Sequence, residues 1–214
     1  LNRDMSLFDI TMIGVGAMIG AGIFVLTGIA AGEAGPALIL AFALNGVITL
    51  FTAMVYAELG SAIPEAGGGY LWVKEGLPGP NAFLSGWMSW FAHAVAGSLY
   101  ALGFGGYMGL VFSEVGIFQS IDPTLLGKGF AVLIIALFMA INFKGASETS
   151  TIGNVVTILK IIVLLIFIVS GLLTILDHPV YMKKFSENFA PNELAGVLGA
   201  MGLTFIAFEG YEII

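Results

Sequence analysis

Cysteine is missing from this chain of 214 residues, and charged residues are scarce. The absence of cysteine excludes disulfides, thiolate metal sites and cysteine nucleophiles. Charged residues make up only 10% of the chain, whereas a typical soluble domain contains about 25%. The seven lysines and arginines form no basic patch, so no nucleic-acid partner is expected. We also expect neither a metal ion nor a cofactor.

Hydrophobic residues make up 58% of the chain, and its mean hydropathy is +1.02. A helix needs about 20 apolar residues to cross the hydrocarbon core of a bilayer, and the chain contains several such runs separated by short polar breaks. The alternating pattern of an outer-membrane barrel is absent. These features predict an all-α integral membrane protein surrounded by a lipid bilayer.

The apolar runs predict five membrane spans and the beginning of a sixth. Their ranges are 6–31, 36–59, 82–112, 130–143 and 155–176, followed by a loop at 177–193 and a sixth span at 194–214. Ser6 and Asp9 are typical of a helix N-terminus. Gly105 and Gly109 form a GxxxG pair, which predicts close approach of another helix. Because the sequence stops within an apolar run, we expect it to be a fragment of a longer chain.

Glycine is unusually frequent in the first span, where the stretch GVGAMIGAGIFVLTGIAAGEAG (residues 14–35) has seven glycines. A glycine within a helix costs about 1 kcal/mol relative to alanine, so such crowding needs a reason. One interpretation is close packing of a neighbouring helix, which the glycines alone favour. The other is an unwound backbone near Gly20 and Gly22, whose free N–H groups would suit a carboxylate.

The sixth span contains two acidic residues, Glu209 and Glu212, deep in an apolar run and next to Gly210. An intramembrane carboxylate costs a few kcal/mol or more, so it is a functional-site hypothesis by default. The first and sixth spans are therefore interrupted at comparable places. Paired interrupted helices at corresponding positions of two repeats indicate a transporter site.

Three motifs resemble those of the amino acid–polyamine–organocation (APC) transporters. They are IGVGAMIGAGIF in the first span, PEAGGGY at 64–70 and TFIAFEGYE in the sixth span, and they occur in the expected order. The resemblance implies a five-plus-five inverted-repeat (LeuT-like) fold in which helices one and six are discontinuous. Residues 1–176 would form the first repeat, 177–193 an extracellular loop and 194–214 the start of the second. It also implies a multi-pass protein of the cell membrane with a cytoplasmic N-terminus.

The resemblance further implies secondary active transport of amino acids by alternating access. The substrate carboxylate would lie on N–H groups of the first helix, and its ammonium on carbonyls of the sixth. The residues implied are Ile19, Gly20, Ala21, Gly22 and Ile23 for the carboxylate, and Phe205, Ile206 and Phe208 for the ammonium. Glu209 departs from the usual apolar residue, and could select a cationic substrate, take part in proton coupling or pair with a cation elsewhere. Glu212 matches a family acid, which suggests a gating hydrogen bond.

Lys160 lies about six residues into the fifth span and is followed by almost wholly apolar sequence. One interpretation is a side chain that reaches back to the membrane interface. The other is a coupling lysine that binds and releases a proton, because an ammonium facing packed helices needs acceptors. Proton-driven members of the family carry a lysine at the matching position. There it would approach carbonyls of the first helix near Gly16, which predicts proton coupling.

Two other classes of function are alternatives. A transporter-like sensor or non-transporting subunit could use the same binding site. An intramembrane enzyme is disfavoured because His93 is the only intramembrane histidine, no GxSxG motif is present, and the two deep acids are three residues apart on one helix face. We therefore expect a protein that is not an enzyme.

Overall fold

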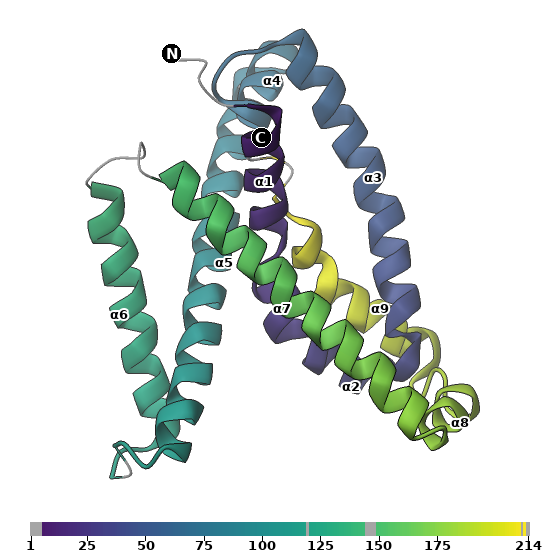
Figure 1. Cartoon of the computed structure of the whole chain (residues 1–214). Helices are drawn as coiled ribbons and strands as arrows, with labels where there is room; N and C mark the ends of the chain where they lie inside the picture. Colours follow the sequence, from purple (N-terminus) through teal and green to yellow (C-terminus); the bar gives the residue numbers. More distant parts are fainter. Residues whose placement is uncertain (1–5, 119, 144–148, 211, 213–214) are drawn as a thin grey trace. The chain divides into compact units, whose positions relative to one another are not determined.

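The computed structural model describes residues 6–118, 120–143, 149–210 and 212 (Figure 1). The side chains at 142, 149–152 and 184 are outside this description, as are Tyr211, Ile213 and Ile214 of the predicted sixth span. None of the described residues lies in a β-strand. The chain divides into two compact units, formed by 1–68 with 149–214 and by 69–148.

The described residues of the first unit form six α-helices joined by shorter helical turns. Its α-helices are α1 (Leu7–Met18), α2 (Thr27–Ala34), α3 (Leu38–Ala62), α7 (Thr149–Asp177), α8 (Val180–Glu187) and α9 (Glu193–Thr204). The turns are the π-helix η1 (Gly22–Leu26) and the 3-10 helices η2 (Gly35–Ala37) and η4 (Phe205–Phe208). Within this unit α9 packs against α2 and α3, and α1 packs against α7.

The N-terminus of α1 is a capping box. The Ser6 hydroxyl accepts the Asp9 N–H at 3.2 Å, and the Asp9 carboxylate accepts the Ser6 N–H at 3.0 Å. Each side chain thus accepts a hydrogen bond from a backbone N–H that has no acceptor within the helix. Such a cap contributes about 1 kcal/mol to the stability of the helix. The helix start predicted from these two residues is confirmed.

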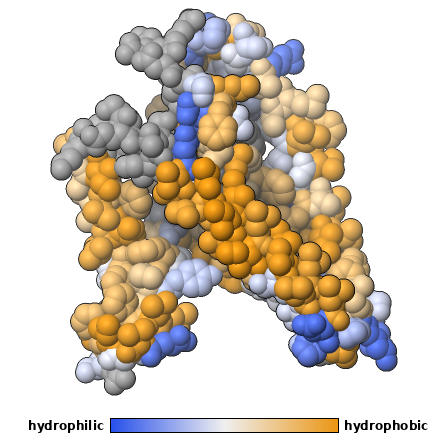
Figure 2. Space-filling view, in the orientation of Figure 1, coloured by the Kyte–Doolittle hydropathy of each residue, from blue (hydrophilic) through white to orange (hydrophobic). Residues whose placement is uncertain are grey.

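Small side chains form the core between α2, α3 and α9. The buried cluster consists of Ala30, Ala34, Ala37, Ala41, Val197 and Ala200. Small residues let helix backbones approach closely, which is how helices associate where lipid is as apolar as their side chains. The large apolar side chains are mostly exposed instead. Figure 2 shows them over α7, which crosses the front of this unit.

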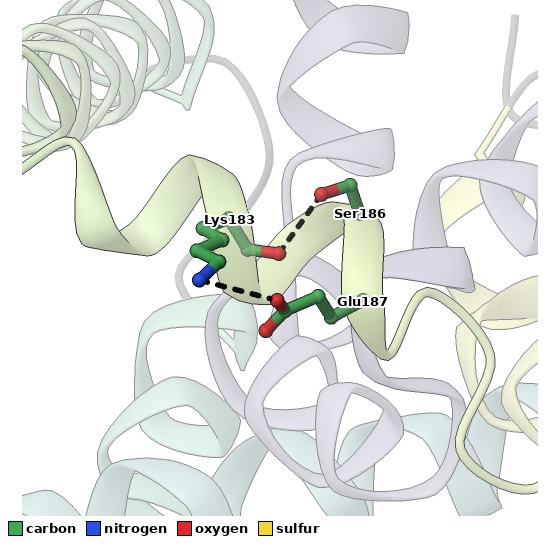
Figure 3. Close-up of polar contacts among 3 residues, drawn as sticks. All are labelled: Lys183, Ser186 and Glu187. Atoms are coloured by element: carbon green, nitrogen blue, oxygen red, sulfur yellow. Dashed lines mark hydrogen bonds and ion pairs between the residues drawn. The ribbon is translucent and has the colours of Figure 1, made fainter.

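The predicted loop at 177–193 contains the short helix α8. Lys183 Nζ lies 3.6 Å from Glu187 Oε1, and the Ser186 hydroxyl donates to the Lys183 carbonyl at 2.9 Å (Figure 3). Both charged side chains are exposed, so this pair stabilises the helix by at most a few tenths of a kcal/mol. These contacts are local to the connection between α7 and α9.

The second unit contains α4 (Gly68–Gly76), which begins at its boundary, α5 (Gly79–Glu114) and α6 (Pro123–Phe143). A Cβ on Gly109 would lie 2.8 Å from the carbonyl oxygen of Pro123, and one on Gly105 would lie 2.9 Å from the backbone nitrogen of Ala131. Glycine at both positions therefore allows α6 to lie directly on α5. The close helix approach predicted from this GxxxG pair is confirmed.

Four stretches of the described residues are long and apolar enough to cross a membrane. They are Leu7–Ala62, Gly79–Glu114, Pro123–Ile141 and Gly153–Asp177, and Glu193–Phe208 is a shorter apolar helical stretch. The first stretch includes both the first and the second predicted spans. The helix around the predicted span 130–143 begins earlier, at Pro123. These features support a multi-pass membrane protein, and the individual spans remain predictions.

Candidate functional site

The first span changes its helical geometry between Met18 and Gly22. α1 ends at Met18, and Ile19 has non-helical angles (φ −79°, ψ 81°). The Gly20 N–H donates to the Met18 carbonyl at 2.9 Å, and the Gly20 carbonyl accepts from Phe24 at 3.3 Å. A new helical segment with π geometry then begins at Gly22. The N–H groups of Ile19, Gly20 and Ile23 donate to the carbonyls of Val15, Met18 and Gly20. Ala21 and Gly22 lie at the start of the new segment, where a helix leaves N–H groups without an acceptor inside it.

The sixth span changes geometry in the same way, with carbonyl groups at the change. α9 ends at Thr204 and is followed by the 3-10 turn η4. Glu209 is extended (φ −71°, ψ 147°), and Gly210 has φ +130°, a conformation that favours glycine. The last carbonyls of a helix have no donor within it. The end of this span therefore presents backbone acceptors.

The two altered segments touch each other. A Cβ on Gly22 would lie 2.6 Å from both the nitrogen and the Cα of Ala207. A Cβ on Gly210 would lie 2.8 Å from the Met18 nitrogen and 2.9 Å from the Ala17 Cβ. Only glycine allows these approaches. The beginning of one helical segment, where the dipole is positive, thus lies beside the end of another, where it is negative.

The structure brings the predicted substrate-binding residues to this contact. Ile19, Gly20, Ala21, Gly22 and Ile23 form one side, while Phe205, Ile206, Phe208 and Glu209 form the other. The Phe208 ring is turned toward α3, with its centroid 6.0 Å from that of Phe42. Glu212, the predicted gating residue, accepts the Gly210 N–H through Oε2 at 2.8 Å.

Lys160, on α7, reaches the end of α1. Its Nζ donates to the carbonyl oxygen of Gly16 at 3.0 Å. In a continuous helix the Gly16 carbonyl would accept from Gly20, whose N–H donates to Met18 instead. A cation at a helix C-terminus is stabilised by the helix dipole. The structure therefore places Lys160 at a carbonyl that lacks its α-helical donor because the helix changes geometry at Ile19.

Two more side chains of α7 bind α1 in the direction of its N-terminus. The Thr157 hydroxyl donates to the Met12 carbonyl at 3.4 Å, and the Asn154 amide donates to the Asp9 carboxylate at 2.9 Å. Positions 154, 157 and 160 are three residues apart and therefore share one face of α7. Of these three residues, only Lys160 is predicted from the sequence. The signal that could have found the others is this spacing of polar residues in an apolar helix.

A buried polar contact joins α3 to α9. Asn45 is 1% exposed and Thr204 is fully buried. The Asn45 amide donates to the Thr204 hydroxyl at 3.1 Å and to the Met201 carbonyl at 2.8 Å. An asparagine in an apolar run signals that a partner exists. It does not identify that partner.

The second unit contains a cleft of about 500 Å³ lined by residues of α4 and α5. Its lining residues are Tyr70, Lys74, Gly79, Ala82, Phe83, Gly86, Trp87 and Trp90. None of the predicted site residues lines it. His93 is the histidine that an intramembrane enzyme would have to use. Its Nδ1 lies 2.7 Å from the carbonyl oxygen of Ser89 on its own helix.

Comparison with known proteins identifies the chain's relatives. The family model described as Amino acid permease matches residues 5–214. The branched-chain amino acid permease BcaP of Bacillus subtilis is 34% identical, over 100% of this chain and 47% of that protein. The cationic amino acid transporter 4 of Mus musculus is 32% identical (100% and 35%), and the methylthioribose transporter of B. subtilis is 33% identical (100% and 47%).

The chain spans about half the length, or less, of these curated relatives. The relatives are named permeases and transporters, which points to a transporter rather than an enzyme. The family match extends over nearly all of the chain and includes the three motifs on which the resemblance rested. The chain belongs to the amino acid permease family of the APC superfamily.

Proposed function

We propose that the protein containing this chain is a secondary active transporter of amino acids. The observation that supports this most directly is the contact between Gly22 and Ala207, where the first and sixth spans both leave regular α-helix. Backbone donors at one side and acceptors at the other match the two charged ends of a zwitterion. The family match and the names of the relatives support the same function.

The substrate carboxylate binds at residues 19–23, where the N–H groups of Ala21 and Gly22 lie at the start of the new helical segment. The ammonium binds carbonyls of Phe205, Ile206 and Phe208. Glu209 adds a carboxylate at the acceptor side, where we propose that it favours cationic amino acids. Relatives named for branched-chain and for cationic substrates both match this chain. The alternatives to this selectivity role are that Glu209 takes part in proton coupling or pairs with a cation elsewhere. Substitution of Glu209 by glutamine distinguishes the three roles.

Protons are the proposed driving ion, with Lys160 as the group that binds and releases them. Its bond to Gly16 joins α7 to the open end of α1. Loss of the proton removes the charge at this helix end, which weakens the hydrogen bond from Lys160 to the Gly16 carbonyl. This provides a physical link between protonation and the substrate-binding segment at residues 19–23, which begins three residues after Gly16.

Transport proceeds by alternating access in a five-plus-five inverted-repeat fold, with the first and sixth helices unwound at the substrate. The N-terminus is cytoplasmic and the protein lies in the cell membrane. Glu212 acts as a gate through hydrogen bonds at the end of the sixth segment, where it already accepts the Gly210 N–H.

A transporter-like sensor is the second candidate, because the same contact would bind an amino acid without moving it. The deciding experiment uses the full-length protein purified into proteoliposomes and a panel of labelled amino acids, with methylthioribose added because one relative is named for it. We expect accumulation of at least one amino acid under an inward proton gradient and none under a sodium gradient alone. Binding without uptake would favour the sensor, and absence of amino acid binding would contradict the proposed function.

A further inference from the structure

Asn45 and Thr204 are the largest fully buried side chains in the part of the chain that the structure describes, and both are polar. An amide buried among apolar helices is unfavourable unless its hydrogen bonds are made. Asn45 donates to the carbonyl of Met201 at 2.8 Å and to the hydroxyl of Thr204 at 3.1 Å. Thr204 in turn donates to the carbonyl of Ala200 at 2.8 Å.

These bonds lie at the last α-helical turn of the sixth span. The Met201 carbonyl also accepts the backbone N–H of Phe205, the residue at which the 3-10 turn begins. It therefore has two donors, one from its own helix and one from Asn45. The amide of Asn45 holds α9 at the point where α-helix gives way to the tighter turn.

The same face of α3 also holds the other end of the 3-10 turn. The Phe208 ring lies 6.0 Å from the Phe42 ring, measured between centroids, and a Cβ on Gly46 would lie 3.5 Å from the Phe208 ring edge. Positions 42, 45 and 46 share a helix face because they are three and four residues apart. α3 thus contacts both the beginning and the end of Phe205–Phe208.

We propose that Asn45 is a positioning residue for the substrate site, an inference that rests on the proposed amino acid binding. By fixing where the sixth span leaves α-helix, it determines which carbonyls of Phe205–Phe208 are free and where they point. A helix that continued in α geometry would engage different carbonyls in its own hydrogen bonds. Asn45 therefore acts on the ammonium of the substrate through the backbone of η4, without touching the substrate.

The alternative is that Asn45 only joins α3 to α9. The two roles differ in which ligands they affect. Loss of a positioning residue weakens ligands that use the sixth-span carbonyls and leaves ligands without an ammonium unchanged. Loss of a purely structural contact weakens all ligands together with the stability of the protein.

The test uses the full-length protein in detergent and the amino acid that its wild type binds best. Binding is measured for this amino acid and for the carboxylic acid that lacks its amino group. Asn45→Leu removes the donor at similar volume. The matched control is Thr49→Val, because Thr49 is also buried on α3 and donates only to carbonyls of its own helix, those of Asn45 and Gly46.

We expect Asn45→Leu to weaken binding of the amino acid about tenfold or more, which is the scale of a hydrogen bond to a charged group. Affinity for the analogue without the amino group should stay within about twofold, and Thr49→Val should bind both ligands like the wild type. Thr204→Val keeps the bond from Asn45 to Met201, so we expect a smaller loss, about threefold, with the same preference between ligands. If Asn45→Leu does not fold, Thr204→Val distinguishes the positioning role from the structural one.

Equal weakening of both ligands, with a lower melting temperature than Thr49→Val, would overturn the proposal in favour of a structural contact. Unchanged amino acid binding in both Asn45→Leu and Thr204→Val would overturn it as well. If the wild type binds no amino acid, the proposed function fails before any variant is made, and the inference fails with it.

Discussion

Lys160 Nζ lies 3.0 Å from the carbonyl oxygen of Gly16, although the two residues are 144 positions apart. The carbonyl is open because the Gly20 N–H, its partner in a continuous helix, donates to Met18. The lysine thus completes the end of α1 and connects α7 to the interrupted part of the first span. In the proposed proton coupling, this bond is the link between the charge of Lys160 and the backbone at Gly20.

Replacement of Lys160 should uncouple transport from the proton gradient. We expect Lys160→Met, which keeps the apolar stem, to lose gradient-driven accumulation about tenfold or more while still exchanging substrate across the membrane. The measurement is uptake in proteoliposomes with and without a pH gradient. Lys128→Met, an exposed lysine of α6, is the control and should behave like the wild type. Full accumulation by Lys160→Met, or uptake driven by sodium alone, would contradict the coupling role.

A side chain at Gly22 should abolish substrate binding. Its Cβ would collide with the backbone of Ala207, which cannot move aside as a flexible side chain could. We expect Gly22→Val to lower amino acid binding below detection and to reduce the melting temperature by several degrees.

Gly28→Ala is the matched control for this change, because a Cβ at Gly28 meets nothing within 4 Å and alanine favours the helix by about 1 kcal/mol. It should bind substrate normally and be slightly more stable. Wild-type binding by Gly22→Val would show that the contact between the two spans is not the substrate site.

Neutralising Glu209 should change substrate preference. We expect Glu209→Gln to weaken lysine or arginine about tenfold and leucine much less, because the carboxylate attracts a second positive charge in a partly buried site. Competition by each amino acid against one labelled substrate measures this. A loss of pH dependence at unchanged preference would indicate proton coupling, and a loss of stability alone would indicate pairing with a cation.

The 214-residue chain alone should not transport. It spans 47% of the length of the branched-chain permease it resembles, and alternating access requires the rest of that length to close around the substrate. Proteoliposomes that contain the full-length protein should therefore take up substrate. Proteoliposomes that contain an equal amount of this 214-residue chain should not. Transport by the chain alone would show that the proposed fold is wrong.

The sequence was sufficient to predict an all-α membrane protein, because composition, the length of apolar runs and helix caps can be read from residues close together in the chain. The helix start at Ser6 and the packing surface at Gly105 and Gly109 are local patterns that the structure reproduces. The order of three motifs indicated the family, which the match over residues 5–214 confirms. The predicted helix bounds were less accurate. Residues 60–81, which lie between the second and third predicted spans, contain α4, where Tyr70 and Lys74 are one helical turn apart.

The sequence shows polar groups and glycines at positions where a membrane helix tolerates them only for a reason. Glycine crowding at Gly22 fitted either close packing or an unwound backbone. The structure shows the close packing, against Ala207, and Gly22 is the first residue of a π-helix. Asn45 and Thr204 are 159 positions apart, and only the tertiary structure decided that they meet. A buried polar group requires a partner, but helical periodicity identifies only the face on which it lies. The partner depends on which helix packs against that face, and packing is decided by contacts between segments far apart in the chain.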